Sequence, residues 1–255
     1  AGMSGYTVEV VGAATESPPA AATALLATGA DASVSLNWTD NSVDETGFIV
    51  QRSVSSGGGF STVTTTGADA TSYTDTGLSA GTEYFYRVIA TNSGGNSDPT
   101  DEASATTYTT SEAWRDDFFG QTANEGNAAD TADFDDDGLV NLLERAFGTA
   151  PDDSESHVPM PAIEKTHVEG TGTDHLSITY RRLKGGSGTP YTVDGMTYTV
   201  EYDTDLVDPW SSGSTTQVGG PISNGDGTET VTVRLDADVS EESKQFIRLK
   251  VTANE

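Results

Sequence analysis

Short runs of alternating apolar and polar residues, ended by Gly, Ser, Asp or Asn, limit most strongly how this chain can fold. Such runs occur between residues 20 and 107 and again from about residue 158. Residues 83–92 are the most apolar run, and NGDG at 224–227 is a typical hairpin turn. Alternation with period two indicates strands with one buried face, and turns at this spacing indicate antiparallel sandwiches. The pattern therefore predicts a mainly β fold with two sheet-rich regions.

The composition agrees with several small units rather than one large core. Only 34% of the 255 residues are hydrophobic, while 28 are glycine. A chain of this length is expected to form two or three compact units. Cysteine is absent, which excludes disulfides, thiol catalysis and cysteine-based zinc sites. Many secreted bacterial modules do without disulfides, whereas secreted animal proteins usually carry them.

The net charge restricts the partners. Twelve basic and 40 acidic residues give 12 − 40 = −28. This charge repels nucleic-acid phosphates and anionic lipid surfaces, so we expect no nucleic-acid partner. We expect no membrane insertion either, since no apolar run approaches the roughly 20 residues of a membrane span. The charge favours divalent cations as partners, although adaptation to a saline habitat explains it as well.

Residues 1–17 contain a single alternating run, GYTVEVVG at 5–12, which stops before Pro18 and Pro19. One strand cannot bury a face alone. We favour the interpretation that it is the remnant of a preceding domain, which makes upstream domains of the same polypeptide the first expected partners. The alternative is that the strand pairs with an exposed edge of another copy and builds a fibre.

Residues 18–108 carry the marks of a specific sandwich. Trp38 falls in the second expected strand, and Leu78, Thr82 and Tyr84 form an L-x-x-x-T-x-Y pattern. This region resembles a fibronectin type III domain, in which the corner tyrosine hydroxyl bonds the backbone of the preceding loop. The resemblance implies an immunoglobulin-like sandwich that serves as a spacer, since the fold itself does not fix a function. We expect Trp38, Tyr84 and Tyr86 to fill the core rather than to form a sugar-stacking platform.

Residues 109–156 are predicted to be an acidic helical linker that binds calcium. Residues 111–120 have Ser111 as a plausible N-cap and aromatic residues at helical spacing. Residues 133–144, DFDDDGLVNLLE, then fit a twelve-position calcium loop. The glycine at position 6 allows a sharp turn, and the predicted ligands are the side chains at positions 1, 3, 5, 9 and 12 with the carbonyl at position 7. In order along the chain, the six ligands are Asp133, Asp135, Asp137, Leu139, Asn141 and Glu144.

The alternative for this segment is an acidic linker without a cation. Four carboxylates in twelve residues with no basic residue among them would then repel one another. A plain linker also has no need of Gly138 or of the apolar pattern of Leu142, Leu143 and Phe147, which makes the following helix amphipathic. Magnesium is disfavoured because it demands octahedral geometry and keeps its waters. We therefore expect Ca²⁺.

The segment also resembles single calcium repeats of thrombospondin type 3 or dockerin-like character, over about residues 112–153. These occur in large secreted bacterial proteins as (W)…FG…ADxDxDGLxNLxEYAxGTDP. The matching residues are Trp114, Phe119, Gly120, Ala132, Asp133, Asp135, Asp137, Gly138, Leu139, Asn141, Leu142, Glu144, Ala146, Gly148 and Thr149. Arg145 replaces the usual aromatic residue and Ala150 the aspartate. The resemblance implies a structural, extracellular site, and the absence of a second copy disfavours cohesin docking.

Residues 157–255 are expected to form a second small antiparallel β domain. Alternating runs such as 196–204 and 228–235 support it, and TYTVEYDTDLVDPW at 197–210 is similar to a β domain that follows calcium repeats in the same bacterial proteins. Trp210 lies in the loop after a strand and is the candidate for stacking on a sugar. The alternative is that it plugs the core. Eight of the twelve basic residues lie here, as solvated edge charges or a polysaccharide patch.

These observations predict a chain that is not an enzyme. The three histidines, His157, His167 and His175, have no paired Ser or Cys motif nearby, and two small sandwiches offer no large cleft for a pair of catalytic carboxylates. We expect an extracellular or cell-surface, bacterial, structural or accessory segment stiffened by calcium. The alternatives are a carbohydrate-binding module of a polysaccharide-degrading enzyme, or a subunit of a surface fibre that assembles by strand donation.

Overall fold

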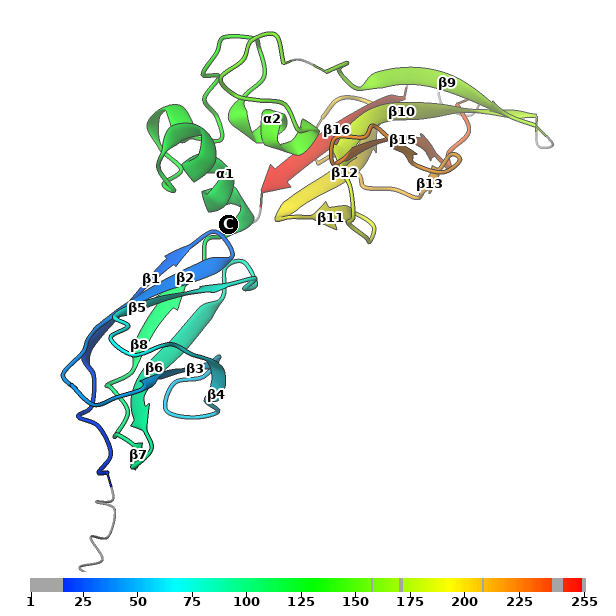
Figure 1. Ribbon diagram of the computed structural model, residues 1–255. Coiled ribbons are helices and arrows are strands. Elements are labelled where there is room, and N and C mark those ends of the chain that lie inside the picture. The colour runs from blue at the N-terminus through cyan, green and yellow to red at the C-terminus, as the bar shows by residue number, and fades with distance from the viewer. Residues whose placement is uncertain (1–15, 157, 170–171, 208, 240–244, 254–255) are drawn as a thin grey trace, which may run out of the picture. The chain divides into compact units, whose positions relative to one another are not determined.

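The computed structural model describes residues 16–156, 158–169, 172–207, 209–239 and 245–253. The chain divides after Tyr108 into two compact units, here called the N-terminal unit (1–108) and the C-terminal unit (109–255). Figure 1 shows that strands dominate both units and that the helices gather in one segment between them in sequence. Among the described residues, no helix is long and apolar enough to cross a membrane. The predicted mainly β fold is confirmed.

The N-terminal unit is a sandwich of two antiparallel sheets. The first sheet has the order β1-β2-β5, with β1 at Thr23–Ala30, β2 at Ser33–Thr39 and β5 at Ser72–Thr76. The second has the order β4-β3-β6-β7, with β8 also pairing with β6. Its strands are β3 (Gly47–Ser53), β4 (Ser61–Thr65), β6 (Glu83–Asn92), β7 (Gly95–Asn96) and β8 (Ala103–Thr106). The non-sequential strand orders bring the two sheets over a common core.

The core of this unit is built from the inward positions of the alternating strands. Its largest members include Trp38, Tyr84 and Tyr86, which are 5%, 6% and 0% exposed. The ring of Trp38 lies 5.6 Å from that of Phe48 on the facing sheet, at a tilt. Because successive residues of a strand point to opposite faces, the apolar set of each strand meets in the middle. The expectation that these aromatic residues fill the core is confirmed.

The predicted corner between β5 and β6 is also present. Tyr84 Oη accepts a hydrogen bond from the backbone N–H of Ser79 at 3.1 Å, and Leu78 is buried beside it. The bond fixes the loop that precedes β6, because a buried hydroxyl needs a partner and the loop N–H supplies it.

The C-terminal unit contains a second antiparallel sandwich. One sheet has the order β13-β15-β10-β9, with β14 also pairing with β15, and the other has the order β11-β12-β16. The first group is β9 (Ala162–Val168), β10 (Thr173–Leu183), β13 (Thr215–Gln217), β14 (Ile222–Ser223) and β15 (Thr228–Leu235). The second group is β11 (Tyr191–Val193), β12 (Met196–Asp203) and β16 (Phe246–Ala253). The NGDG turn predicted from the sequence lies between β14 and β15, as expected for a hairpin.

The helical segment holds α1 (Thr110–Phe119), a 3₁₀ turn η1 (Gly126–Ala128) and α2 (Asn141–Phe147). The N-cap of α1 is Thr109 rather than the expected Ser111. The reason is a capping box: the N–H of Glu112 donates to Thr109 Oγ1, and the carboxylate of Glu112 accepts the N–H of Thr109. Ser111 is instead buried within the first turn.

The helix α2 belongs to the core of the C-terminal sandwich. Ala146 and Phe147 are 0% and 3% exposed within its hydrophobic cluster, and Leu142 and Leu143 pack against the same cluster. The hydroxyl of Tyr198 on β12 donates to the carbonyl of Ala146 at 2.6 Å. Residues 109–156, expected to be a linker, therefore form one compact unit with the sandwich. The apolar face of α2 is the physical reason, since it has to be buried somewhere.

Candidate metal centre

The loop between η1 and α2 is shaped by its own aspartates. Asp133 Oδ2 accepts the N–H of Gly138 at 3.0 Å, and Asp137 Oδ1 accepts that of Leu139 at 2.7 Å. Asp135 Oδ1 accepts the N–H of Asp137 at 3.2 Å. Gly138 has φ 96°, a left-handed conformation that a glycine adopts without strain. Each aspartate therefore uses one oxygen to hold the loop and keeps the other oxygen for a different partner.

The second oxygens lie where a single cation would reach them. One carboxylate oxygen from each of Asp133, Asp135 and Asp137 lies within 4.8 Å of the other two. Calcium–oxygen bonds are about 2.3–2.6 Å long, so two ligands on opposite sides of one ion are about 5 Å apart. The three side chains are only partly exposed. Their arrangement matches the coordination distances of a hard divalent cation.

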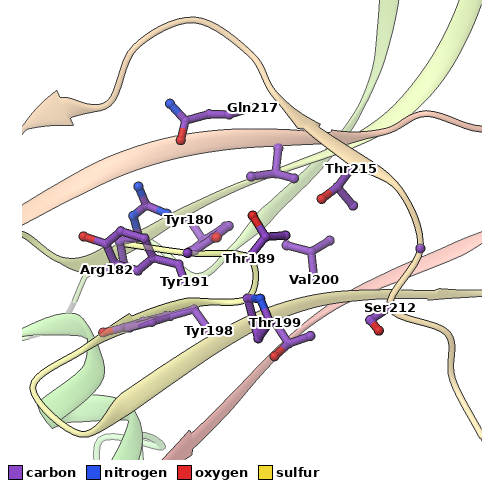
Figure 2. Close-up of a pocket in the computed structure, with 14 residues that line it drawn as sticks. Tyr180, Arg182, Thr189, Tyr191, Tyr198, Thr199, Val200, Ser212, Thr215 and Gln217 are labelled. Atoms are coloured by element: carbon purple, nitrogen blue, oxygen red, sulfur yellow. The ribbon is translucent and has the colours of Figure 1, made fainter. Parts of the chain in front are cut away.

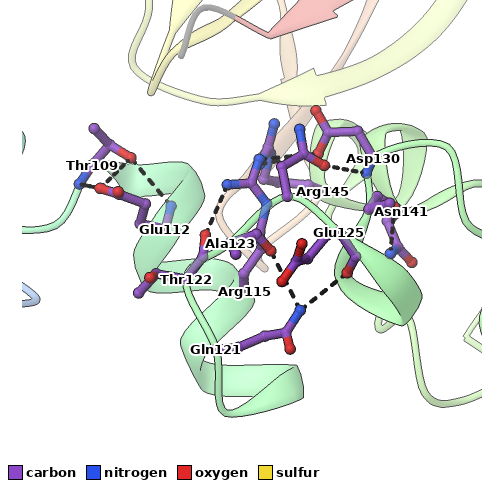
Figure 3. A network of polar contacts seen from close by, with 12 residues as sticks. Thr109, Glu112, Arg115, Gln121, Thr122, Ala123, Glu125, Asp130, Asn141 and Arg145 are labelled. Atoms are coloured by element: carbon purple, nitrogen blue, oxygen red, sulfur yellow. Dashed lines mark hydrogen bonds and ion pairs between the residues drawn. The ribbon is translucent and has the colours of Figure 1, made fainter.

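Two fully buried side chains on α2 complete the set. Asn141 and Glu144 are both 0% exposed. The amide nitrogen of Asn141 donates to the carbonyls of Asn127 and Ala129 at 2.7 and 2.8 Å, which leaves its oxygen free (Figure 3). Burial, followed by the charges of the loop aspartates, raises the pKa of Glu144 to about 7. A carboxylate in such a place is costly unless a cation accompanies it.

Unpartnered buried oxygens provide the test of whether the predicted ligands fit a metal. Among the described residues, the buried side-chain oxygens without a hydrogen-bond partner include six from the predicted ligands. They are Asp133 Oδ1, Asp135 Oδ2, Asp137 Oδ2, Asn141 Oδ1, Glu144 Oε1 and Glu144 Oε2. Buried polar atoms are almost always satisfied in native proteins. Six exceptions within one twelve-residue loop fit a cation with a preference for oxygen. The ligand role of the Leu139 carbonyl stays a prediction, although the residue itself is buried.

A buried ionic cluster next to the loop was not foreseen from the sequence. Asp130 Oδ1 lies 3.4 Å from Arg115 Nη2 and 3.7 Å from Arg145 Nη1, and both arginines are nearly inaccessible (Figure 3). The carbonyl of Asp130 also accepts the N–H of Leu142 at the start of α2. Arg145 lies with its guanidinium 5.8 Å from the ring of Trp114. Arg145, which replaces the usual aromatic residue of the repeat, thus places its guanidinium near the ring of Trp114 on α1 and beside the carboxylate of Asp130.

Aromatic contacts connect α1 to the loop. Phe119 lies edge-on to Trp114 at 5.9 Å, and Phe134, the second residue of the loop, lies edge-on to Phe119 at 5.4 Å. Such edge-to-face pairs stabilise beyond the area that they bury. Position 2 of the loop is therefore fixed to α1 by packing rather than by a ligand.

Trp210, the candidate for sugar stacking, lies in the loop after β12 and is half-buried. The guanidinium of Arg248 on β16 lies 4.1 Å from the centre of its ring. A cation over a tryptophan face is a favourable contact and covers that face. The stacking role of Trp210 stays a prediction.

A cavity of about 210 Å³ lies in the C-terminal sandwich (Figure 2). Tyr180 and Tyr198 stack near each other in its wall, with ring centres 6.4 Å apart. Arg182 lies over the ring of Tyr191 and pairs with Glu229 at 2.8 Å. Further polar residues that line the cavity are Thr189, Thr199, Ser212, Thr215 and Gln217. The cavity has the mixed aromatic and polar lining of small-molecule sites.

The expectation that the chain is not an enzyme also took the sequence to contain no G-x-S-x-G stretch, which is wrong, because residues 77–81 read GLSAG. In hydrolases this spacing forms a turn between a strand and a helix. Here it is the corner between β5 and β6, where the carbonyl of Ser79 accepts a hydrogen bond from Thr107 Oγ1 at 2.6 Å. His175 is buried in the C-terminal unit, with Nδ1 2.9 Å from the carbonyl of Leu235. The stretch is therefore a structural turn without the hydrolase geometry.

The fold and the corner define the N-terminal unit as an immunoglobulin-like module. A profile of the fibronectin type III domain matches residues 17–106. These residues therefore belong to the fibronectin type III family, as the sequence resemblance implies. Domains of this family generally serve as structural or accessory modules rather than catalysts. The resemblances stated for the loop and for the C-terminal sandwich stay predictions.

Solved structures similar to the chain match it over about a third of its length. A fibronectin type III-like protein from Clostridium thermocellum is 33% identical, with 36% of this chain and 95% of that one covered and a TM-score of 0.32. The domain of a human fibronectin type III domain-containing protein is 30% identical, with 38% and 93% covered and a TM-score of 0.32. A β-1,2-glucanase from Parabacteroides distasonis is 21% identical, with 41% of this chain and 16% of the enzyme covered and a TM-score of 0.31. The curated proteins include no match.

Proposed function

We propose that the chain is a calcium-binding structural segment of a larger extracellular bacterial protein. In this proposal, the fibronectin type III domain acts as a spacer, and one Ca²⁺ between Asp133 and Glu144 fastens the helical segment to the C-terminal sandwich. The segment is an accessory to other domains of its polypeptide and performs no catalysis. The presence of a fibronectin type III domain, common in extracellular modular proteins, and the net charge of −28 support this location and role.

The observation that carries the proposal is the set of six buried, unpartnered oxygens on the five side chains predicted as ligands. Without a cation, Glu144 and three aspartates repel one another and leave polar atoms unsatisfied. With a cation, the same atoms supply the six to eight oxygens that calcium takes. Calcium fits better than magnesium because the donors are carboxylates and carbonyls of the chain itself, which leave little room for bound water.

The position of the ligands explains what the ion does mechanically. Asp133, Asp135 and Asp137 lie on the loop, whereas Asn141 and Glu144 lie on α2, which is packed into the sandwich core. An ion held by both groups ties the loop to a helix that cannot move without disturbing that core. Binding energy therefore becomes folding energy of the C-terminal unit. The ion would keep the segment that follows the fibronectin type III domain ordered, so that the spacer stays stiff.

Calorimetric titration of the whole chain with calcium tests the proposal. The informative variant is Asp137→Asn, which keeps Oδ1 as the acceptor for the N–H of Leu139 but removes the charge. We expect one binding event in the native chain at this loop, and at least a tenfold loss of affinity in the variant. Glu155→Gln is the matched control, because Glu155 is exposed in the same segment. Equal titrations of Asp137→Asn and the native chain would refute the proposal.

A second candidate function, carbohydrate binding, is favoured by the cavity in the C-terminal sandwich. The cavity volume of about 210 Å³ accommodates a single sugar ring, and the lining includes the buried side chains of Tyr180 and Tyr198 together with polar residues such as Thr199. Binding to a panel of polysaccharides, compared between the native chain and Thr199→Trp, tests it, because the larger side chain would fill the cavity. The alternative of strand donation depends on residues 6–11, which lie outside the described residues. Ordered assembly of the whole chain would support that alternative.

A further inference from the structure

A second group of carboxylates lies in the N-terminal unit, away from the loop described above in sequence and in a different compact unit. Asp40 follows β2, Glu45 precedes β3, and Asp69 lies between β4 and β5. One oxygen from each lies within 4.8 Å of the other two, the same spacing as in the loop aspartates. Three carboxylates from two loops thus meet at one point, although Asp69 is 24 residues from Glu45 in sequence.

Glu45 is the buried member of this group. It is 7% exposed, and its Oε1 accepts the N–H of Asp69 at 3.0 Å. Its Oε2 is buried and has no hydrogen-bond partner. A buried, unpartnered oxygen on a side chain that lies among other carboxylates is costly unless a cation is bound.

The described part of the N-terminal unit offers no free side-chain cation for this position. Residues 16–108 contain eleven acidic residues and two basic ones, a net charge of 2 − 11 = −9. Arg52 pairs with Asp75 at 2.7 Å. Arg87 donates to Gln51 at 2.7 Å and covers the ring of Phe60. Both arginines are thus engaged elsewhere, so neither of them serves as the cation of this cluster.

We propose that Asp40, Glu45 and Asp69 form a second divalent-cation site, in which calcium ties the β2–β3 loop to the β4–β5 loop. The donors are hard oxygens, as calcium prefers, and bound water completes the coordination because Asp69 is exposed. With three chain ligands instead of six, the site is weaker than the loop of the C-terminal unit. The inference is independent of the proposed function, since the two sites share no residue.

Counting bound calcium in the whole chain by native mass spectrometry and calorimetry tests the inference. The key variant is Glu45→Gln, which keeps an oxygen acceptor for the N–H of Asp69 and removes the charge. At millimolar calcium, we expect two ions in the native chain, one in Glu45→Gln, one in Asp137→Asn and none in the double variant. Asp98→Asn, an exposed substitution in the same unit, is the control and should keep two.

The outcomes separate the two sites. If Asp137→Asn binds no calcium, or if Glu45→Gln still binds two ions, the inference is overturned. If Asp137→Asn still binds calcium and the double variant does not, the inference stands, whether or not the loop of the C-terminal unit binds calcium. Backbone amide shifts of residues 40–45 and 69 under calcium titration provide a readout that does not depend on a variant. Unmoved shifts at these residues would also overturn the inference.

Discussion

Replacing Glu144 by glutamine should change the stability of the C-terminal unit in opposite directions with and without calcium. The substitution removes a buried charge whose two oxygens lack partners in the absence of a cation. The variant without calcium should therefore be more stable than the native chain without calcium. The same substitution removes the bidentate ligand of the loop, so calcium should no longer stabilise the variant.

The size of the first effect follows from the pKa of Glu144, which is raised from 4.5 to about 7. One pKa unit corresponds to about 1.4 kcal/mol, so at pH 8 the ionised side chain costs the folded state about 3 kcal/mol. For a unit of this size, that amounts to about 10 °C in Tm. The second effect follows from mass action: with a Kd of about 10⁻⁴–10⁻³ M and about 10 mM calcium, the native chain gains about 1.4–2.7 kcal/mol.

Differential scanning calorimetry at pH 8, in chelator and in about 10 mM calcium, measures both effects. This concentration is about ten to a hundred times the expected Kd. The C-terminal unit of Glu144→Gln should melt higher than that of the native chain in chelator, and its Tm should not shift on addition of calcium. Glu155→Gln should behave as the native chain in both buffers. The reasoning would be refuted if Glu144→Gln melted lower in chelator, or if the native chain showed no calcium response.

Three further expectations follow from single features. Without calcium, the C-terminal unit should lose stability as the pH rises from about 4.5 through about 7, because the raised pKa of Glu144 favours its neutral form in the folded state. Thermal melts in chelator at several pH values show whether stability falls with rising pH. Gly138→Ala should lower the free energy of unfolding of the C-terminal unit by about 1–2 kcal/mol and weaken calcium binding, because a φ of 96° strains a residue that has a Cβ. Thermal melts and calcium titration measure the two effects. Tyr84→Phe should cost the N-terminal unit about 1–2 kcal/mol through loss of the bond to Ser79, without changing calcium affinity, as chemical denaturation would show.

The sequence predicted the N-terminal sandwich well because its signals are local. Alternation along each strand identifies the buried face, and the spacing of Leu78, Thr82 and Tyr84 identifies the corner. The loop of the C-terminal unit was predicted for the same reason. Its predicted ligands follow one another within twelve positions, so their spacing alone indicates which side chains should lie close together. The structure brings the three loop aspartates together as that spacing implies, while the ion itself stays a proposal.

Features that depend on tertiary contacts were not predictable in this way. No local pattern tells that Asp130 meets Arg115 and Arg145, which come from different helices. The cluster of Asp40, Glu45 and Asp69 joins two loops through the fold of the sandwich and has no motif. The assignment of residues 109–156 to the C-terminal unit was also not predictable. The sequence of an amphipathic helix indicates which of its faces is buried, but it does not indicate which other element covers that face.

The burial of α2 has a consequence for how such a segment can be transplanted. The calcium loop and the sandwich that follows it share one hydrophobic cluster, so they form a single cassette for recombination. A cut at residue 156 would expose Phe147 and its neighbours to water on the first fragment. It would also uncover, on the second fragment, the part of the sandwich core against which they pack. Among the described residues, each of the two hydrophobic clusters lies wholly on one side of Tyr108, and a graft that begins at Thr109 carries its own helix cap with it.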